Sequence, residues 1–444
     1  MAGSRKEEQA PRRDRNEDRG SRSRRRKKSR RRELMAAWTV LILVVIVIAG
    51  AAAGGVYLFT QMGDGSVGAA AKEESREVVR ETFPEGEPPA DSRTSGEKAE
   101  AFLREMTLEQ KVAQMFVITP EQMTGYTLVT AAGDASKTAY QTYPVGGLIY
   151  FKNNLESPDQ VKAMLKNMDR YSRDIARVPV FLGVDEEGGT VKRVGSQAAF
   201  GVPDVPDMAL VGASGNIEDG FGAGSTIGNY LADLGFNLDF APVADVLTNA
   251  DNQAMAKRSF GTDPQTVADY SGRFLDGLRE KGICGVLKHF PGQGSVAGDT
   301  EYGFQATDKT LDQLMAQDLV PFQAGISKGA DMIMAGHVSA PAVTGDQTPA
   351  SLSQVLLTEV LRGKMGYDGV VITDALNMGA IVEHYQSDVA AVMAVQAGAD
   401  LLLMPDDFQA AYDGVLKAVG EGTISEERIN QSVSRILKLK FDRL

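Results

Sequence analysis

The chain has 444 residues, 43% of them hydrophobic, with one cysteine, three histidines and a net charge of −12. A single cysteine excludes an intrachain disulfide and a cysteine-based zinc or iron–sulfur site, and three histidines argue against a His-rich metal centre. Residues 1–33 hold 15 Lys and Arg against six Asp and Glu, so the remaining chain carries a net charge of about −21. This acidic body argues against nucleic-acid binding, which needs a basic face on the folded part.

The basic block at residues 1–33 is followed by an uncharged, apolar run over residues 34–62. About 20 apolar residues span a bilayer, whereas the core of a cleaved signal peptide has only ~7–15. We therefore expect a single-pass transmembrane signal anchor, with cleavage near the Ala-rich residues 49–53 as the alternative. Positive charge marks the cytoplasmic side of a span, which predicts a cytoplasmic tail over residues 1–33 and places residues 63–444 on the extracellular side of the cell membrane.

The stretch after the apolar run, residues 63–96, is polar and acidic and contains Gly and Pro. It has no sustained apolar face, which predicts a flexible, disordered linker. The globular part is expected from residue 97, because apolar residues recur at helical spacing from Ala101 to Val112.

Eight short apolar runs alternate with amphipathic helical stretches over residues 97–444. Near-continuous apolar strands separated by helices are typical of a parallel sheet covered by helices. Eight such units in about 345 residues predict an α/β fold, a single (β/α)8 TIM barrel. An open doubly wound sheet is the alternative, although no G-x-G-x-x-G motif follows the first run. The candidate strands are residues 113–118, 145–151, 179–185, 236–245, 285–290, 331–338, 369–376 and 399–405.

Polar side chains stand at the ends of five of these runs. In a TIM barrel the active site lies at the carboxyl ends of the strands, so these groups are expected to meet at one face. A lone charged residue at a strand end is as often a capping or solvating group, but five on one face are harder to explain in that way. The residues are Asp185, Asp245, Lys288 with His289, His337 and Asp374.

These polar groups favour glycoside hydrolysis. The sequence has neither a G-x-S-x-G nucleophile elbow nor a P-loop. What remains is a set of carboxylates with few histidines, and cleavage of a glycosidic bond needs one carboxylate nucleophile and one proton donor. That reaction needs no cofactor and no metal, and we expect neither.

Five motifs follow one another along the barrel region: FLGVDEEGGTVKRV, KRSFGTDP, KHFPGQGSVAGDTEYG, MIMAGHV and GVVITDALNMGAI. In this order they resemble the motifs of glycoside hydrolase family 3, and most of all its bacterial β-N-acetylglucosaminidase (NagZ-type) branch. The resemblance covers about residues 100–442. It implies a TIM barrel, which agrees with the strand pattern.

The resemblance also implies roles for individual residues. Asp374 matches the family's nucleophile. The alternative interpretation is that Asp374 caps the following helix. The implied substrate-binding residues lie at or near strand ends. The alternative interpretation is that they form a network of structural ion pairs. For His337 two other interpretations are equally good: a residue that orients a neighbour, or a core histidine whose hydrogen bonds are satisfied. The substrate-binding residues are Asp185, Arg193, Arg258, Lys288, His289 and His337.

The glycine-rich loop after the fifth run departs from this branch, in which it typically reads KHFPGHG…DSH. There the last histidine is the proton donor, paired with the Asp two residues earlier. Here Gln293 replaces the first of these two histidines and Glu301 the last, while Asp299 is kept. We expect Glu301 to act as the acid/base, with its pKa raised by Asp299 and by closure of the loop.

The chain is therefore predicted to be a retaining exo-β-glycosidase that removes terminal β-linked GlcNAc from cell-wall fragments or other glycans. Its expected partners are a GlcNAc-containing glycan or muropeptide and, through the N-terminal helix, the membrane. One alternative is an extracellular sugar- or peptidoglycan-binding module with impaired catalysis. The other is a β-glucosidase-like enzyme of the same family.

Overall fold

The computed structural model describes residues 93–444. The predicted cytoplasmic tail, the predicted anchor at residues 34–62 and the linker up to residue 92 lie outside these residues. Within residues 93–444, no helix is both long enough and apolar enough to cross a bilayer. The first helix, α2 (Ser95–Leu103), begins two residues before the expected start of the globular part, because Thr94 and Glu97 form a capping box at its N-terminus.

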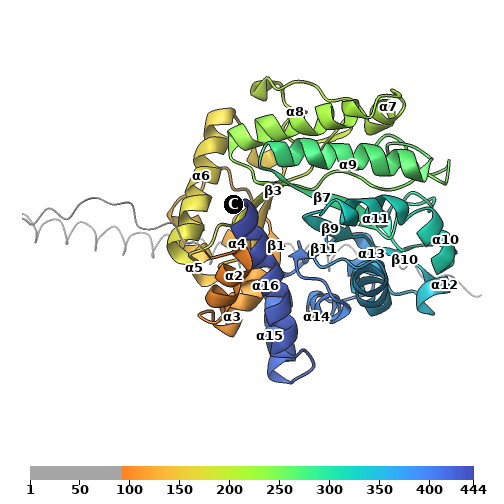
Figure 1. Cartoon of the computed structure of the whole chain (residues 1–444). Coiled ribbons are helices and arrows are strands. Elements are labelled where there is room, and N and C mark those ends of the chain that lie inside the picture. The colour runs from red at the N-terminus through yellow and green to blue at the C-terminus, as the bar shows by residue number, and fades with distance from the viewer. Residues whose placement is uncertain (1–92) are drawn as a thin grey trace, which may run out of the picture. The chain divides into compact units, whose positions relative to one another are not determined.

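Eight parallel strands form the predicted barrel (Figure 1), in the order β11-β9-β7-β6-β3-β2-β1-β12. A parallel bridge between Ile372 and Leu401 joins the two ends of this order, so the barrel is nearly closed. Each of the eight predicted apolar runs matches one of these strands, with β7 beginning one residue before its run, which confirms the parallel barrel over the open sheet. The strands are β1 (Phe116–Ile118), β2 (Gly147–Tyr150), β3 (Phe181–Val184), β6 (Leu238–Asp239), β7 (Cys284–Phe290), β9 (Met332–Ala335), β11 (Val370–Thr373) and β12 (Leu402–Leu403).

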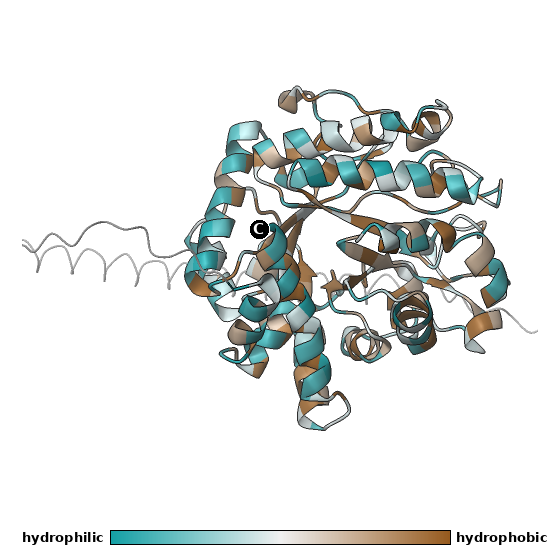
Figure 2. Ribbon diagram, viewed as in Figure 1, coloured by the Kyte–Doolittle hydropathy of each residue, from teal (hydrophilic) through white to brown (hydrophobic). Residues whose placement is uncertain are grey.

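The barrel core is filled by the side chains of these strands. All residues of the eight strands are buried, as expected when one side faces the barrel interior and the other faces helices. Figure 2 shows the strands as the hydrophobic centre and hydrophilic colour on the outer faces of many helices. Gly183 in β3 leaves room for an aromatic neighbour, since a Cβ there would lie 2.8 Å from the ring of Phe240.

Helices return the chain between strands and cover the barrel. One of the amphipathic stretches between the strands is α6 (Pro158–Ile175), which begins after the capping side chain of Ser157. The helical stretch expected between Ala101 and Val112 is instead two helices, α2 and α3 (Leu108–Gln114), because Thr107 starts a second capping box with Gln110.

Two long helices, α8 (Glu218–Leu234) and α9 (Pro264–Glu280), run side by side (Figure 1). Gly224 permits their close approach, because a Cβ there would lie 2.1 Å from the carbonyl oxygen of Phe274. The other helices are α4 (Pro120–Thr124), α5 (Asp134–Thr142), α7 (Met208–Gly212), α10 (Leu311–Ala316), α11 (Val320–Ser327), α12 (Pro341–Thr344), α13 (Gly379–Val382), α14 (Ser387–Ala397), α15 (Phe408–Gly420) and α16 (Glu426–Arg443).

Shorter elements occupy the connections. A π-helix, η5 (Val355–Lys364), lies between β9 and β11. Two small strand pairs lie in loops that follow barrel strands: β4 (Glu186–Gly188) with β5 (Val191–Lys192), and β8 (Gln305–Ala306) with β10 (Val338–Ser339). The 3-10 turns are η1 (Lys152–Asn154), η2 (Ala198–Phe200), η3 (Thr300–Tyr302) and η4 (Ala350–Leu352).

Candidate active site

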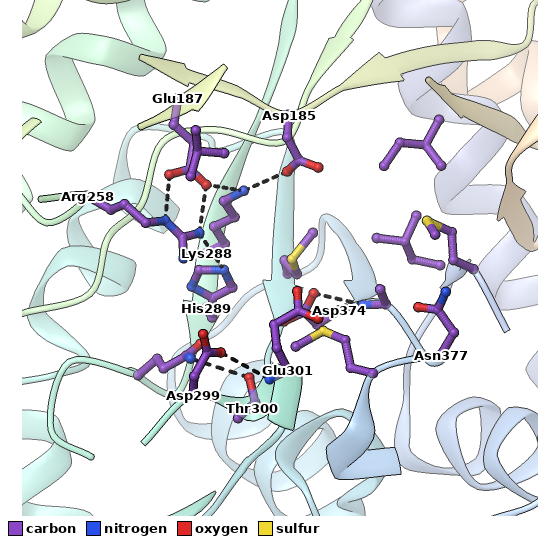
Figure 3. Close-up of a pocket in the computed structure, with 18 of the residues that line it drawn as sticks. Asp185, Glu187, Arg258, Lys288, His289, Asp299, Thr300, Glu301, Asp374 and Asn377 are labelled. Carbon is purple, nitrogen blue, oxygen red and sulfur yellow. Dashed lines mark hydrogen bonds and ion pairs between the residues drawn. The ribbon is translucent and has the colours of Figure 1, made fainter. Parts of the chain in front are cut away.

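A cavity of about 390 Å³ lies at the carboxyl ends of the barrel strands (Figure 3), where TIM barrels place their active sites. The fold brings eight of the nine predicted site residues to its wall, although they are spread along the chain. Those eight are Asp185, Arg193, Arg258, Lys288, His289, Asp299, Glu301 and Asp374. His337 is not among the lining residues.

A network of ion pairs forms one side of the cavity. Lys288 Nζ lies 2.9 Å from Asp185 Oδ1 and 2.6 Å from Glu187 Oε1. Arg258 donates two hydrogen bonds to Glu187, from Nε to Oε2 at 2.8 Å and from Nη2 to Oε1 at 2.7 Å. Burial raises the pKa of Glu187, but the charges of Arg258 and Lys288 more than offset this, so its pKa lies well below the ordinary value. Glu187 is thus an ionised partner of both cations.

Glu187 was missed by the sequence analysis, although a signal for it exists. Successive side chains of an extended segment point to opposite sides, so Asp185 and Glu187 share one side and Glu186 faces the other. The structure shows this alternation. Asp185 and Glu187 line the cavity, whereas Glu186 is fully buried and accepts a hydrogen bond from the hydroxyl of Tyr230 at 2.8 Å.

Arg193 is brought to the cavity by the β4–β5 hairpin. The carboxylate of Glu186 accepts three backbone hydrogen bonds, from Arg193, Val194 and Gly195, at 2.6, 2.9 and 2.8 Å. These bonds fix the segment after β5. The Arg193 guanidinium then lies 5.7 Å from the ring centroid of Phe151 and 3.8 Å from Asp185 Oδ2. Arg193 therefore stands between an aromatic face and a carboxylate in the cavity wall.

Asp245 does not line the cavity; it acts through His289. The Asp245 side chain is fully buried, and its Oδ2 lies 2.7 Å from His289 Nδ1. A carboxylate bonded at Nδ1 fixes the orientation of the imidazole ring, so that Nε2 points away from the carboxylate. Nε2 lies 3.5 Å from Nη2 of Arg258, on the side of the ion-pair network. Asp245 is thus the support of a cavity residue.

Asp374 follows β11 and is 9% exposed. Its backbone N–H donates to Ala335 O at 2.7 Å, and its Oδ1 accepts from the N–H of Ala375 at 2.8 Å. Figure 3 shows its carboxylate directed into the cavity, between the ion-pair network and Glu301. The next helix, α13, begins after Met378 as its N-cap, so Asp374 is not a helix cap.

Glu301 lies in η3 and faces the same cavity. Asp299 caps this turn, since its Oδ1 accepts from the N–H of Glu301 at 3.0 Å. Partial burial, followed by the negative charges of Asp374 and Asp299, raises the pKa of Glu301 above its ordinary value. The sequence analysis expected Asp299 and loop closure as causes, and Asp374 is a further one. A carboxyl group of raised pKa beside a second carboxyl group suits a general acid with a nucleophile.

His337 is fully buried and contacts the backbone after Asp374. Its Nε2 lies 2.9 Å from Ala375 O and its Nδ1 lies 2.8 Å from Ser351 Oγ. Burial lowers the pKa of His337, and the neutral ring then donates from Nε2 to the carbonyl and accepts at Nδ1 from the hydroxyl. His337 is predicted to bind substrate, but it does not line the cavity, and its hydrogen bonds are those of a residue that orients the segment carrying Asp374.

The remaining wall is mostly apolar. Sequence analysis gave no signal for these residues, because their types are those of any buried core. Among residues 93–444, no group of three His, Cys, Asp or Glu side chains is arranged to hold a metal ion. The further lining residues include Ile149, Met334, Asn377, Met378, Leu403 and Met404.

Several known proteins are similar to this chain. Beta-hexosaminidase LpqI of Mycobacterium tuberculosis is 35% identical over 271 residues, which cover 59% of this chain and 68% of that protein. Beta-hexosaminidase A of Pseudoalteromonas piscicida is 30% identical over 321 residues, which cover 67% of this chain and 53% of that protein. The chain thus spans between about half and two thirds of the length of these relatives.

A solved structure is similar as well. A glycoside hydrolase family 3 β-N-acetylglucosaminidase from Paenibacillus sp. str. FPU-7 superposes with a TM-score of 0.71 at 37% identity, over 76% of this chain and 63% of that chain. The sequence profile of the glycosyl hydrolase family 3 N-terminal domain matches residues 107–439, the whole barrel. With the barrel and its cavity of opposed carboxylates, these matches show that the chain belongs to glycosyl hydrolase family 3.

Proposed function

We propose that the protein is a retaining β-N-acetylglucosaminidase in which Asp374 is the nucleophile and Glu301 the acid/base. The observation that carries the proposal is the pairing of these two carboxyl groups at one cavity, where burial and Asp374 raise the pKa of Glu301. Retaining glycosidases need two carboxyl groups, one as the nucleophile and one as the proton donor.

In the first step, Asp374 attacks the anomeric carbon while the bond to the leaving oxygen breaks. Glu301 gives its proton to that oxygen, and a glycosyl ester on Asp374 forms. In the second step, Glu301 takes a proton from water, whose oxygen attacks the anomeric carbon and releases Asp374. The network of Asp185, Lys288 and Arg258 holds the sugar hydroxyls, because its charged groups present donors and acceptors to the cavity.

The preference for a terminal GlcNAc rests on two supports. Relatives at 30 and 35% identity are named β-hexosaminidases, and the similar solved structure is a β-N-acetylglucosaminidase. The cavity of about 390 Å³ is at the small end of the range of about 300–1,000 Å³ for ligand pockets, which suits one terminal sugar and hence exo-action. GlcNAc-containing cell-wall fragments and other glycans are the proposed substrates.

The experiment that tests the proposal is hydrolysis of 4-nitrophenyl β-GlcNAc and 4-nitrophenyl β-glucoside by the full-length protein. Faster release from the GlcNAc substrate, abolished in Asp374→Ala, supports the β-N-acetylglucosaminidase. Preference for the glucoside supports the β-glucosidase-like alternative. A protein that is inert on both but binds GlcNAc in calorimetry is the sugar-binding module.

We propose further that residues 34–62 anchor the protein in the cell membrane with the catalytic domain outside. The support is the uncharged apolar run directly after a basic block. Full-length protein is expected to stay in the membrane fraction after a high-salt wash, whereas residues 93–444 alone are expected in the soluble fraction. Release of the full-length protein by salt would contradict the anchor.

A further inference from the structure

A buried hydrogen-bond path joins His289 in the cavity wall to the loop that carries Glu301. Asp245, which accepts from His289, also accepts from the backbone N–H of Gln293 at 2.6 Å. The Gln293 side chain is 3% exposed, and its Nε2 donates to the hydroxyl of Thr300 at 3.4 Å. Thr300 is fully buried and immediately precedes Glu301. The path therefore ends one residue away from the acid/base.

The need for such a tether follows from the length of the connection. The segment from Pro291 to Lys309 is far longer than the ordinary connection of ~2–6 residues in α/β units. A long segment has many conformations, and general acid catalysis requires the carboxyl group within hydrogen-bond reach of the leaving oxygen. The buried amide of Gln293 and the buried hydroxyl of Thr300 favour the bonded conformation, because each is costly to leave unpaired away from water.

A second contact holds the loop from the other side. Gly379, the first residue of α13, lies so close to the loop that a Cβ on it would stand 2.8 Å from the carbonyl oxygen of Glu301. The loop thus rests on the backbone of α13, while Gln293 holds it at Thr300. Two contacts on different sides fix the turn that presents Glu301.

We propose that Gln293, itself held by Asp245, is a positioning residue that keeps Glu301 in place for proton transfer through its hydrogen bond to Thr300. The proposal rests on the proposed role of Glu301 as the acid/base. Because a glutamine amide does not titrate, the tether holds at every pH at which the protein is folded. Loss of the hydrogen bond between Gln293 and Thr300 affects proton donation by Glu301 more than it affects sugar binding. The ion-pair network of the cavity wall does not depend on this hydrogen bond.

The kinetic test uses two variants that remove the hydrogen bond from either end: Gln293→Met, of similar length, and Thr300→Val, of similar shape. Ser295→Ala is the matched control, because its Oγ makes an equally long bond of 3.4 Å, to Thr307, in the same segment. Thr300→Ser restores the hydroxyl and is expected to restore activity. All four are made in the full-length protein and compared by thermal denaturation.

The readout is kcat/KM for phenyl β-GlcNAc, a poor leaving group that needs the acid, and for 2,4-dinitrophenyl β-GlcNAc, a good one that does not. Gln293→Met and Thr300→Val are expected to lose about tenfold or more on the poor leaving group and less than about threefold on the good one. Ser295→Ala is expected to match the parent on both. Equal losses on the two substrates, or no loss, would overturn the proposal.

A second readout does not depend on activity. Amide hydrogen exchange of residues 294–300 is expected to quicken in Gln293→Met and Thr300→Val but not in Ser295→Ala, since the bond between Gln293 and Thr300 closes this segment. Unchanged exchange in both tether variants would refute the proposal even if the parent hydrolysed no glycoside. Faster exchange with an inert parent would support the tether and refute the proposed function, so the two failures are distinct.

Discussion

Arg258 and Glu187 meet in a bidentate ion pair in the cavity wall, with N–O distances of 2.8 and 2.7 Å. The planar guanidinium fork matches the carboxylate, which fixes the direction of both side chains. Lys288 shares the same carboxylate. Glu187 therefore neutralises two cations at once and keeps them aligned at the cavity wall.

Replacing Glu187 by Gln is expected to destabilise the protein by about 3–5 kcal/mol, because it leaves buried cations short of a partner. Urea unfolding of the barrel domain measures the effect. Asp204→Asn is the control, since Asp204 pairs with Lys192 on the surface with 79% of its side chain exposed. That change is expected to cost less than about 1 kcal/mol. Equal effects of the two substitutions would contradict this account.

The contribution of Glu187 has a defined pH dependence. Its pKa is lowered in the folded protein, below the unfolded value of about 4.3. The stabilisation is therefore complete above about pH 5 and is lost progressively as the pH falls below the unfolded pKa. The unfolding free energies of the parent and Glu187→Gln are expected to converge in acid, measured between pH 3 and pH 7. A constant difference would show that Glu187 is not held ionised by its partners.

The alkaline limb of the activity profile is expected to report the deprotonation of Glu301. Its pKa is raised by burial, by Asp374 and by Asp299. Asp299→Asn removes one like charge but keeps an oxygen to accept the Glu301 N–H, so the limb is expected to move to lower pH. The profile of kcat/KM on phenyl β-GlcNAc measures the shift. A limb that stays in place, or moves to higher pH, would contradict the role of Asp299.

Gly379→Ala is expected to disturb the acid without unfolding the barrel. Its Cβ would lie 2.8 Å from the carbonyl oxygen of Glu301, which is closer than such contacts permit, so the turn must move. A displacement of the acid is expected to lower kcat by about tenfold or more on a poor leaving group. Gly222→Ala in α8 is the control, since a Cβ there meets nothing within 4 Å. Full activity of Gly379→Ala would show that the turn tolerates displacement.

Lys440 is fully buried in α16, with Nζ 2.8 Å from Gln114 Oε1 and 5.0 Å from the ring centroid of Phe181. Burial lowers its pKa to about 7, whereas an unfolded lysine has a pKa of about 10.4. The unfolded chain thus binds more protons between these values, and Lys440 destabilises the fold most at and below pH 7.

Lys440→Met is therefore expected to raise the free energy of unfolding at pH 6 by about 1–3 kcal/mol, because the unpaired Gln114 oxygen offsets part of the gain. The difference is expected to shrink toward pH 10. Thermal denaturation of both proteins across this range measures it. A gain that does not vary with pH would show that the lysine charge is not its cause.

The strand positions followed from the sequence because a buried parallel strand requires a continuous apolar run. Their ends were less predictable. The run over residues 236–245 contains only Leu238–Asp239 as strand, since Pro242 has no N–H to donate to a ladder. The same run carries Asp245 beyond the strand, as a support for His289 rather than a cavity residue.

The cavity residues were predictable where a motif marked them, as for Asp374, Lys288 and Arg258. Glu187 was missed because its role depends on which way a short hairpin points its side chains. The position of His337 depends on later parts of the chain, such as the one with Ser351, which bury its side chain. The motif MIMAGHV alone does not indicate this burial. The hydrogen bond between Gln293 and Thr300 could not be predicted from the sequence, because only the folded loop brings the two side chains together.

Strand β12 closes the barrel, and the backbone around Asp374, the proposed nucleophile, depends on it. The N–H of Thr373 donates to Leu401 O at 3.0 Å, and that of Leu376 donates to Leu403 O at 2.9 Å. Leu401 and Leu403 carry these acceptors, and they are synthesised 27 and 29 residues after Asp374. A nascent chain that stops before residue 401 already contains every proposed catalytic group, yet it lacks the partners that hold Asp374 in place. We expect such a chain to be inert, so catalytic competence begins only when synthesis of this strand is complete.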